Sequence, residues 1–206
     1  LCQILGRNNR LWHDIRFFRV LSHTFPIMQN HNLSSRVFPR VLLLGLCFSP
    51  FVVSAKTIMI VGDSLSAGYG IQPQQGWVHL LQKRLEQQYP KQHKVVNASV
   101  SGETTSGALA RLPKLLQTHR PDVVVIELGG NDGLRGQPPQ MIQKNLAQLI
   151  QQSQKTNATV VVLGMKMPPN YGTAYSKAFE NNYKHIEKVQ KKHKTSLYPS
   201  SPITKI

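Results

Sequence analysis

Short β-branched runs alternate with longer amphipathic stretches from Lys56 onward, and this rhythm limits the fold more than any other feature of the chain. We expect strands at residues 57–61, 94–98, 122–128, 158–165 and 195–198. The third and fourth runs, DVVVIEL and ATVVVLGM, are almost continuously apolar, which is typical of strands that are covered on both faces.

Four amphipathic stretches lie between these runs. Each carries apolar residues three or four positions apart, so each is predicted to be a helix whose apolar stripe packs in the core. Pro113 is expected near a helix start or at a kink. The stripes are Trp77, Leu80, Leu81 and Leu85; Leu109, Leu112, Leu115 and Leu116; Met141, Ile142, Leu146, Leu149 and Ile150; and Phe179, Tyr183, Ile186 and Val189.

The alternation of strands and helices predicts a three-layer α/β/α sandwich with a central parallel sheet and right-handed crossovers. We assign this single domain to residues 56–206, a length that allows a substantial core. In such sheets ligands bind at the carboxyl ends of the strands. The residues that follow each strand are therefore the ones to inspect for chemistry.

The chain is strongly basic, with 25 Lys and Arg against 9 Asp and Glu. A basic surface raises non-specific affinity for phosphates and anionic lipids. However, the charges are spread over several predicted helices, and no recognition motif or aromatic platform accompanies them. We therefore expect no nucleic-acid partner. Both cysteines, Cys2 and Cys47, precede the predicted domain, which fits an oxidising compartment without disulfides.

Residues 28–55 have the features of a secretory signal peptide. Two arginines precede the apolar run at 41–53, which has the length of a signal-peptide core and is short for a membrane span. Small residues before and at Ala55 predict cleavage there, which leaves a mature chain that starts at Lys56. We expect an exported protein, periplasmic or secreted, with no stable membrane anchor after cleavage.

Two alternatives for this segment fit less well. A buried helix is disfavoured because Pro50 interrupts the run and no amphipathic face is visible. A lipoprotein anchor on Cys47 is disfavoured because Leu46 stands where a small residue is needed. Residues 1–27 precede the first methionine, Met28, and we interpret them as an upstream extension, translated in frame, without a functional role.

Three residues with chemical potential follow the first three predicted strands. Ser64, Gly102 and Asn131 lie after the first, second and third strand, respectively. A serine at a strand-to-helix turn can project its hydroxyl into a cleft. A glycine lets the backbone approach a ligand, and an asparagine amide can donate to it. Each alone also fits an ordinary turn or helix cap, but all three at one sheet edge favour a common site.

The sequence motifs around these residues resemble those of the SGNH hydrolases, also called GDSL esterases and lipases. They read GDSLSAGYG at 62–70, VNASVSGETTSGALARLP at 96–113 and VIELGGNDGLRG at 125–136. The resemblance extends from about residue 57 to about residue 198. It is strongest to the branch of bacterial periplasmic acyl-CoA thioesterases, lysophospholipases and arylesterases.

The resemblance implies a flavodoxin-like sheet in the order 2-1-3-4-5 and a hydrolase of acyl esters or thioesters. Ser64 would be the nucleophile, and its N–H, the N–H of Gly102 and the side-chain amide of Asn131 would form the oxyanion hole. The substrate would be a small molecule such as a lysophospholipid, an acyl-CoA or an aryl ester. No metal or cofactor is implied, and we expect a monomer. We interpret Asp63 and Asp132 as turn-stabilising rather than catalytic.

The family pattern also includes an Asp-x-x-His-Pro block near the C-terminus, whose histidine takes the proton of the serine. None of the eight histidines of this chain lies in an Asp-x-x-His pattern, and after Leu197 the sequence reads YPSSPITKI. We therefore expect a domain that is truncated or frameshifted before this block, so that the C-terminal part is missing and the chain is weakly active or inactive. The alternative is a non-catalytic protein of the same fold that binds acyl chains or lipids.

Overall fold

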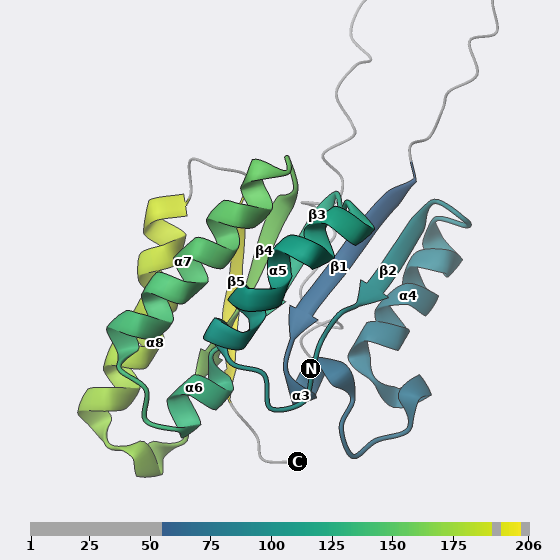
Figure 1. Ribbon diagram of the computed structural model, residues 1–206. Helices are drawn as coiled ribbons and strands as arrows, with labels where there is room; N and C mark the ends of the chain where they lie inside the picture. The colour runs from purple at the N-terminus through teal and green to yellow at the C-terminus, as the bar shows by residue number, and fades with distance from the viewer. Residues whose placement is uncertain (1–54, 191–194, 203–206) are drawn as a thin grey trace, which may run out of the picture. The chain divides into compact units, whose positions relative to one another are not determined.

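The computed structural model describes residues 55–190 and 195–202 (Figure 1). Five strands occur where the sequence predicts them. The ends of the first four differ from the prediction by one residue, and the fifth extends four residues further. The strands are β1 Lys56–Gly62, β2 His93–Asn97, β3 Val123–Glu127, β4 Thr159–Lys166 and β5 Thr195–Pro202.

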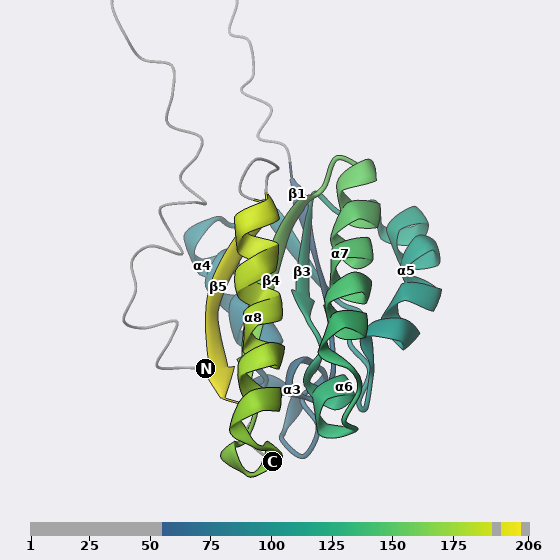
Figure 2. The same cartoon turned by 90° about the vertical axis from the view of Figure 1, so that its left-hand side faces the viewer.

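All neighbouring strands are parallel, and the sheet has the order β2-β1-β3-β4-β5 (Figure 1). In Figure 2, which labels β1, β3, β4 and β5, α5 and α7 lie to one side of the strands and α4 lies to the other. This is the order that the family resemblance implies. The register pairs Ile60 of β1 with Asn97, the last residue of β2, and Gly62 with Glu127, the last residue of β3. The loops that follow these three strands therefore begin at one edge of the sheet.

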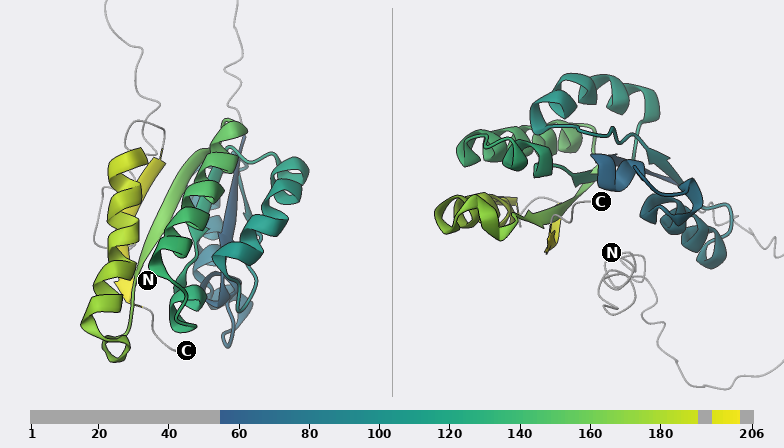
Figure 3. Two further views of the ribbon diagram at one scale, coloured as in Figure 1. Left: turned by 60° about the vertical axis from the view of Figure 1, so that its left-hand side comes forward. Right: turned by 90° about the horizontal axis from the view of Figure 1, so that it is seen from below.

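Alternate residues of the central strands point to opposite faces of the sheet. The larger core, on the face where α5, α7 and α8 pack, takes Met59, Val61, Val124, Ile126, Val160 and Val162. The smaller core, beside α4, takes the intervening residues Ile58, Ile60, Val123, Val125, Val161 and Leu163. Figure 3 shows these helices on the two sides of the sheet, which confirms the three-layer arrangement.

The four long helices occur where the apolar stripes predict them, and two short helices and two 3-10 turns are present in addition among the described residues. They are α3 Ser64–Ala67, α4 Trp77–Gln88, α5 Thr105–His119, α6 Gly130–Leu134, α7 Pro139–Lys155 and α8 Thr173–Gln190, with short 3-10 turns η1 Pro73–Gln75 and η2 Pro169–Tyr171. Pro113 lies inside α5, so the helix start considered for it is wrong. The helix starts earlier because Thr104 caps it, its side chain accepting a hydrogen bond from Gly107 N.

Most stripe residues face the core, but three do not follow the prediction. Met141 and Val189 are 50% and 54% exposed because each lies in a terminal turn of its helix, where fewer neighbours surround it. In α4 the buried residues are Val78 and Leu85, of which the predicted stripe omitted Val78, whereas Leu80 is half-buried and not part of the core.

The interpretations of residues 1–27 and of the signal segment up to residue 54 lie outside the described residues. Within the described part of the chain, none of the helices is both long enough and apolar enough to cross a membrane.

Candidate active site

Ser64 begins a short helical turn directly after β1. Asp63 caps this turn, and its Oδ1 accepts a hydrogen bond from Leu65 N at 3.0 Å. The Ser64 side chain is half-buried, and its hydroxyl has no hydrogen-bond partner among residues 55–190 and 195–202. The turn therefore presents a hydroxyl that no neighbouring group occupies.

Gly102 lies in the loop between β2 and α5. Val100 N donates to Gly62 O at 3.0 Å, so this loop continues alongside the end of β1. Gly102 has a φ of +76°, in the left-handed region that side chains with a Cβ rarely adopt. The loop thus needs glycine at this position for the conformation that it has.

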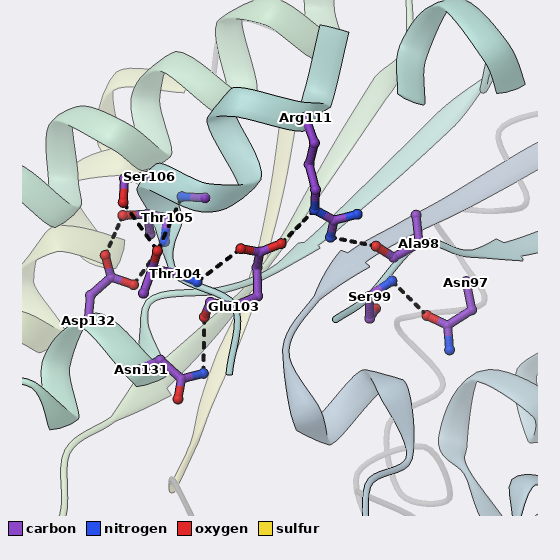
Figure 4. A network of polar contacts seen from close by, with 11 residues as sticks. Asn97, Ala98, Ser99, Glu103, Thr104, Thr105, Ser106, Arg111, Asn131 and Asp132 are labelled. Atoms are coloured by element: carbon purple, nitrogen blue, oxygen red, sulfur yellow. Dashed lines mark hydrogen bonds and ion pairs between the residues drawn. The ribbon is translucent and has the colours of Figure 1, made fainter. Parts of the chain in front are cut away.

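Asn131 lies in the first turn of α6, after β3. Its Nδ2 donates to Asp63 Oδ2 at 3.3 Å and to Glu103 O at 3.0 Å; Figure 4 shows the second contact. Asp63 is the residue before Ser64, and Glu103 is the residue after Gly102. The structure therefore brings together the three loops that carry the predicted site residues, and the Asn131 amide joins them.

The backbone N–H groups of Ser64 and Gly102 are both available as donors. Neither donates a hydrogen bond to any atom of the part of the chain that the structure describes. Asn131 differs, since its amide already bonds to two oxygens in this state. An oxygen atom that bound at the site would have to compete with Asp63 or Glu103 for one of these N–H groups.

An ion pair supports the Gly102 loop from the side of α5. Arg111 Nε donates to Glu103 Oε2 at 2.5 Å, and Arg111 Nη2 donates to Ala98 O at 2.6 Å (Figure 4). The guanidinium thus bridges the two ends of the loop. Arg135 Nη2 also donates to Gly102 O, at 3.2 Å, from the end of α6. These contacts orient the backbone on both sides of Gly102.

Asp132 is buried and joins α6 to the start of α5. Its Oδ2 accepts from Thr105 N at 2.9 Å, and its Oδ1 accepts from the Thr105 hydroxyl at 2.5 Å. With Asp63 as the cap of the Ser64 turn, this geometry agrees with the interpretation of both aspartates as turn-stabilising groups.

Several supporting residues were not singled out from the sequence. Asn97 Nδ2 donates to Ser66 O at 2.8 Å and so ties the Ser64 turn to β2. Glu127 lies beneath the same turn, where its Oε2 accepts from the Ser66 hydroxyl at 2.6 Å. A carboxylate at the end of the apolar run DVVVIEL was a signal that could have indicated Glu127. The roles of Asn97 and Arg111 depend on register and helix rotation, for which the sequence has no signal.

Burial raises the pKa of two of these carboxyl groups. For Asp63 the pKa is raised mainly by burial, and the nearby charge of Asp132 raises it further, against the hydrogen bond from Leu65 N. For Glu127 burial comes first and the charge of Asp63 second, and together they raise the pKa to about 8. Burial therefore favours the neutral form of both acidic groups near Ser64 (Asp63 and Glu127).

No histidine of the described residues contacts Ser64. His93 opens β2 at the opposite edge of the sheet, and His119 ends α5, just before β3 begins. His79 and His185 are exposed on α4 and α8. Within the same residues, no group of three or more His, Cys, Asp or Glu side chains is placed to hold a metal ion.

A parallel sheet that brings an unoccupied serine hydroxyl, backbone donors and an amide to its carboxyl edge is typical of the serine hydrolases of acyl groups. Residues 60–199 match the model of the GDSL-like lipase/acylhydrolase family. The chain belongs to this family, which confirms the resemblance found in the sequence motifs.

Named relatives agree with this assignment. The chain is 48% identical to esterase TesA of Pseudomonas aeruginosa over 164 residues, which are 78% of this chain and 80% of that protein. It is 40% identical to thioesterase 1/protease 1/lysophospholipase L1 of Escherichia coli K12 over 162 residues, 79% of this chain and 75% of that protein.

A solved structure shares the fold. The psychrotrophic esterase EstA from Pseudoalteromonas sp., in a crystal structure of its complex with the inhibitor monoethylphosphonate, is 44% identical, with a TM-score of 0.64. The match covers 69% of this chain and 77% of that one. By family and relatives, the chain is a hydrolase of the esterase and thioesterase type.

Proposed function

We propose that the chain cleaves acyl esters or thioesters through an acyl-enzyme intermediate on Ser64. The Ser64 Oγ attacks the carbonyl carbon, and the π electrons of the C=O bond move onto its oxygen. The tetrahedral intermediate then collapses, the bond to the alcohol or thiol breaks, and the leaving group takes the proton that Ser64 gave up. Water releases the acyl group in a second addition and elimination.

The oxyanion hole of this proposal consists of Ser64 N–H, Gly102 N–H and the Nδ2 amide of Asn131. The convergence at Asn131 is the observation that carries the proposal, because one amide bonds to the neighbours of both other residues. Fixed donors stabilise the negative charge that develops on the carbonyl oxygen, and each contributes about 3 kcal/mol to the transition state in comparable sites.

The proposed substrate is a small acyl ester or thioester, and the candidates are lysophospholipids, acyl-CoA and aryl esters. We propose that no cofactor or metal takes part, because the proposed chemistry uses only hydroxyl and amide groups of this chain. We also propose that the protein is a monomer. Proton transfer is the one step for which the described residues offer no group, since none of their histidines contacts Ser64. We therefore propose that the 206-residue polypeptide turns over slowly or not at all.

Export is a second part of the proposal, supported by the apolar run at 41–53 and the small residues up to Ala55. Expression of the full coding region in a bacterial host, fractionation and sequencing of the N-terminus test it. We expect a periplasmic product that starts at Lys56. A cytoplasmic product with an N-terminus before Met28 would contradict both the export and the interpretation of residues 1–27.

Covalent labelling tests the nucleophile independently of turnover. An alkyl fluorophosphonate forms a stable P–O bond to a serine oxygen and releases fluoride, and a base must take the serine proton. Because the described residues offer no such base, every labelling reaction contains added imidazole as the base, and one label per chain is expected on Ser64. The substitution Ser64→Ala should abolish labelling, whereas Ser106→Ala, which removes an exposed hydroxyl of α5, should not. Absence of labelling together with saturable binding of a fatty acid would instead support the alternative, a non-catalytic acyl- or lipid-binding protein.

A further inference from the structure

A buried carboxyl group lies directly beneath the Ser64 turn. Glu127 is the last residue of β3, is 5% exposed, and pairs in register with Gly62 of β1. Its Oε2 accepts hydrogen bonds from the Ser66 hydroxyl at 2.6 Å and from Asp63 N at 3.4 Å. Glu127 therefore contacts the residues on both sides of Ser64, although it is 63 positions away along the chain.

The backbone of β1 above Glu127 leaves no room for a side chain at Gly62. A Cβ at Gly62 would lie 2.8 Å from Glu127 Oε2 and 2.6 Å from Ser66 Oγ, closer than such atoms approach. Only glycine lets β1 pass over the carboxyl group while the Ser66 hydroxyl reaches it. Gly62, Ser66 and Glu127 thus form one packed unit, which we call the turn anchor.

The turn anchor contains no cation. Neither the ion pair of Lys56 with Asp122 nor that of Arg111 with Glu103 involves Glu127. Its Oε1 is buried without a hydrogen-bond partner among the same residues. A buried carboxylate without a cation is costly, whereas a neutral carboxylic acid is tolerated.

The titratable groups that face Glu127 add no positive charge. Asp63 lies above it in the Ser64 turn, and, second to burial, its charge raises the pKa of Glu127. The charge of Asp132, on α6, acts on Asp63 and on Tyr183. Tyr183 of α8 is buried beside them and donates to Leu128 O at 2.9 Å, and burial raises its pKa well above the ordinary value. Burial favours the protonated form of Glu127, as does the charge of Asp63, and together they outweigh the hydrogen bonds from Ser66 and from the backbone of Asp63 and Ser66, which lower the pKa of Glu127.

We propose that Glu127 is a positioning residue that accepts hydrogen bonds from the Ser66 hydroxyl and the Asp63 N–H and thereby fixes the Ser64 hydroxyl and N–H in the active site. The proposal rests on the proposed function, since it assigns a role to the support of the Ser64 nucleophile. When Glu127 loses its proton to solvent, a second negative charge forms next to Asp63. The repulsion from Asp63 then opposes the hydrogen bonds that hold the turn on the anchor, and we expect the turn to be held less firmly.

The sign of the pH effect follows from the raised pKa. The folded chain holds the Glu127 proton up to a pH of about 8, whereas the carboxyl group has a value of 4.5 without the environment of the fold. Between these values the folded state binds more protons than the unfolded state, so its stability falls as the pH rises. Above a pH of about 8 the loss is complete, and Glu127 is ionised in the folded state as well.

Glu127→Gln separates positioning from charge, because the amide keeps an oxygen for Ser66 and is neutral at every pH. Rates of fluorophosphonate labelling of Ser64 would be measured between about pH 6 and 9, with thermal unfolding recorded in parallel. Glu86→Gln, on the exposed side of α4, removes a charge without touching the anchor and serves as the matched control.

We expect the labelling rate of Glu127→Gln to lie within about twofold of the unsubstituted chain near pH 6, and the ratio of the two rates to rise severalfold with a midpoint near pH 8. Glu86→Gln should show a constant ratio. Ser66→Ala, which removes only the hydroxyl of the anchor, should label about tenfold more slowly at all pH values while it remains folded.

The possible results distinguish a positioning role of Glu127 from a structural one and from a failure of the proposed function. A flat ratio for Glu127→Gln would overturn the effect of ionisation on the turn. Labelling of Ser66→Ala at the rate of the unsubstituted chain would overturn the positioning role. Either result would leave the proposed function intact. Loss of stability in either variant with no change in labelling would show that the carboxyl group only supports the fold. No Ser64-dependent labelling of the unsubstituted chain would overturn both proposals.

Discussion

The amide nitrogen of Asn131 lies 3.3 Å from Oδ2 of Asp63, a residue 68 positions earlier in the chain. The same nitrogen lies 3.0 Å from the carbonyl oxygen of Glu103. Because Asp63 precedes Ser64 and Glu103 follows Gly102, one side chain fixes the spacing of both other loops. Asn131 has two functions in the proposed site: it positions these loops, and it provides a donor to the oxyanion.

Asn131→Ala therefore removes a donor and a link between loops at once. We expect the rate of fluorophosphonate labelling of Ser64 to fall about 10²-fold or more, because the loss of a single oxyanion donor costs about that much in comparable hydrolases. Gln117→Ala, which removes an exposed amide from α5, is the control and should label normally. An unchanged rate for Asn131→Ala would remove Asn131 from the proposed hole.

Gly102 and Gly136 form a matched pair for a test of the second loop. Both have a positive φ, +76° and +67°, and an added Cβ meets no atom closer than 3.9 Å at either position. Alanine at either position should cost about 1–2 kcal/mol of stability through backbone strain. Only Gly102→Ala should also slow the labelling of Ser64, since only there does strain reorient a proposed oxyanion donor.

The measurement compares the two variants by urea unfolding and by labelling. Equal losses of stability with unequal labelling rates would support the Gly102 N–H as a donor. If both variants labelled equally, Gly102 would have only a conformational role in its loop.

The strands of the sheet were predictable because each central strand is specified by a short, local run of apolar residues. DVVVIEL and ATVVVLGM are apolar without interruption, and both became central strands, β3 and β4. The loops of the site were predictable for a related reason: parallel strands place their carboxyl ends at one edge, so residues that follow different strands meet there. Ser64 and Asn131 could therefore be selected as site residues without knowledge of side-chain packing.

The supporting residues were not predictable in this way. Glu127 lies beneath the Ser64 turn only because the register sets Gly62 beside it, and a shift of one residue would turn the carboxyl group to the other face. Arg111 reaches Glu103 and Ala98 only because of the rotation of α5 about its axis. Contacts of this kind depend on the assembled fold, and no local pattern specifies them.

Asp132 offers a test of how the fold supports the site. It is 3% exposed and accepts two hydrogen bonds from Thr105, whose hydroxyl also accepts one from Asn145 Nδ2 at 3.0 Å. Asp132→Ala leaves a buried backbone N–H and a hydroxyl without their acceptor, so we expect a loss of about 1–3 kcal/mol in the free energy of unfolding.

Asp132→Asn is the companion variant. Its amide keeps one acceptor oxygen for Thr105 N, so the loss of stability should be smaller than for alanine. Equal losses in the two variants, measured by thermal unfolding, would show that the charge of Asp132 rather than its hydrogen bonds supports the start of α5.

None of the histidines of the described residues contacts Ser64, and this leads to a prediction about the rate of hydrolysis. If no histidine reaches Ser64 in the 206-residue polypeptide, hydrolysis of a short-chain p-nitrophenyl ester should exceed the rate in water by no more than about 10³–10⁴-fold, the contribution that binding and an oxyanion hole make without a base. Added imidazole can take the role of the base, because it provides in solution the same ring that a histidine would present. We expect it to raise the hydrolysis rate in proportion to its concentration.

Imidazole also hydrolyses such esters by itself, so the control is the Ser64→Ala chain at the same imidazole concentration. The difference between the two chains isolates the reaction at Ser64. Rescue should be larger for imidazole than for 2-methylimidazole, because an extra methyl group next to the attacking nitrogen fits a confined site poorly and has little effect on proton transfer in free solution. Fast hydrolysis without imidazole, abolished by Ser64→Ala, would show instead that the folded chain already contains a base.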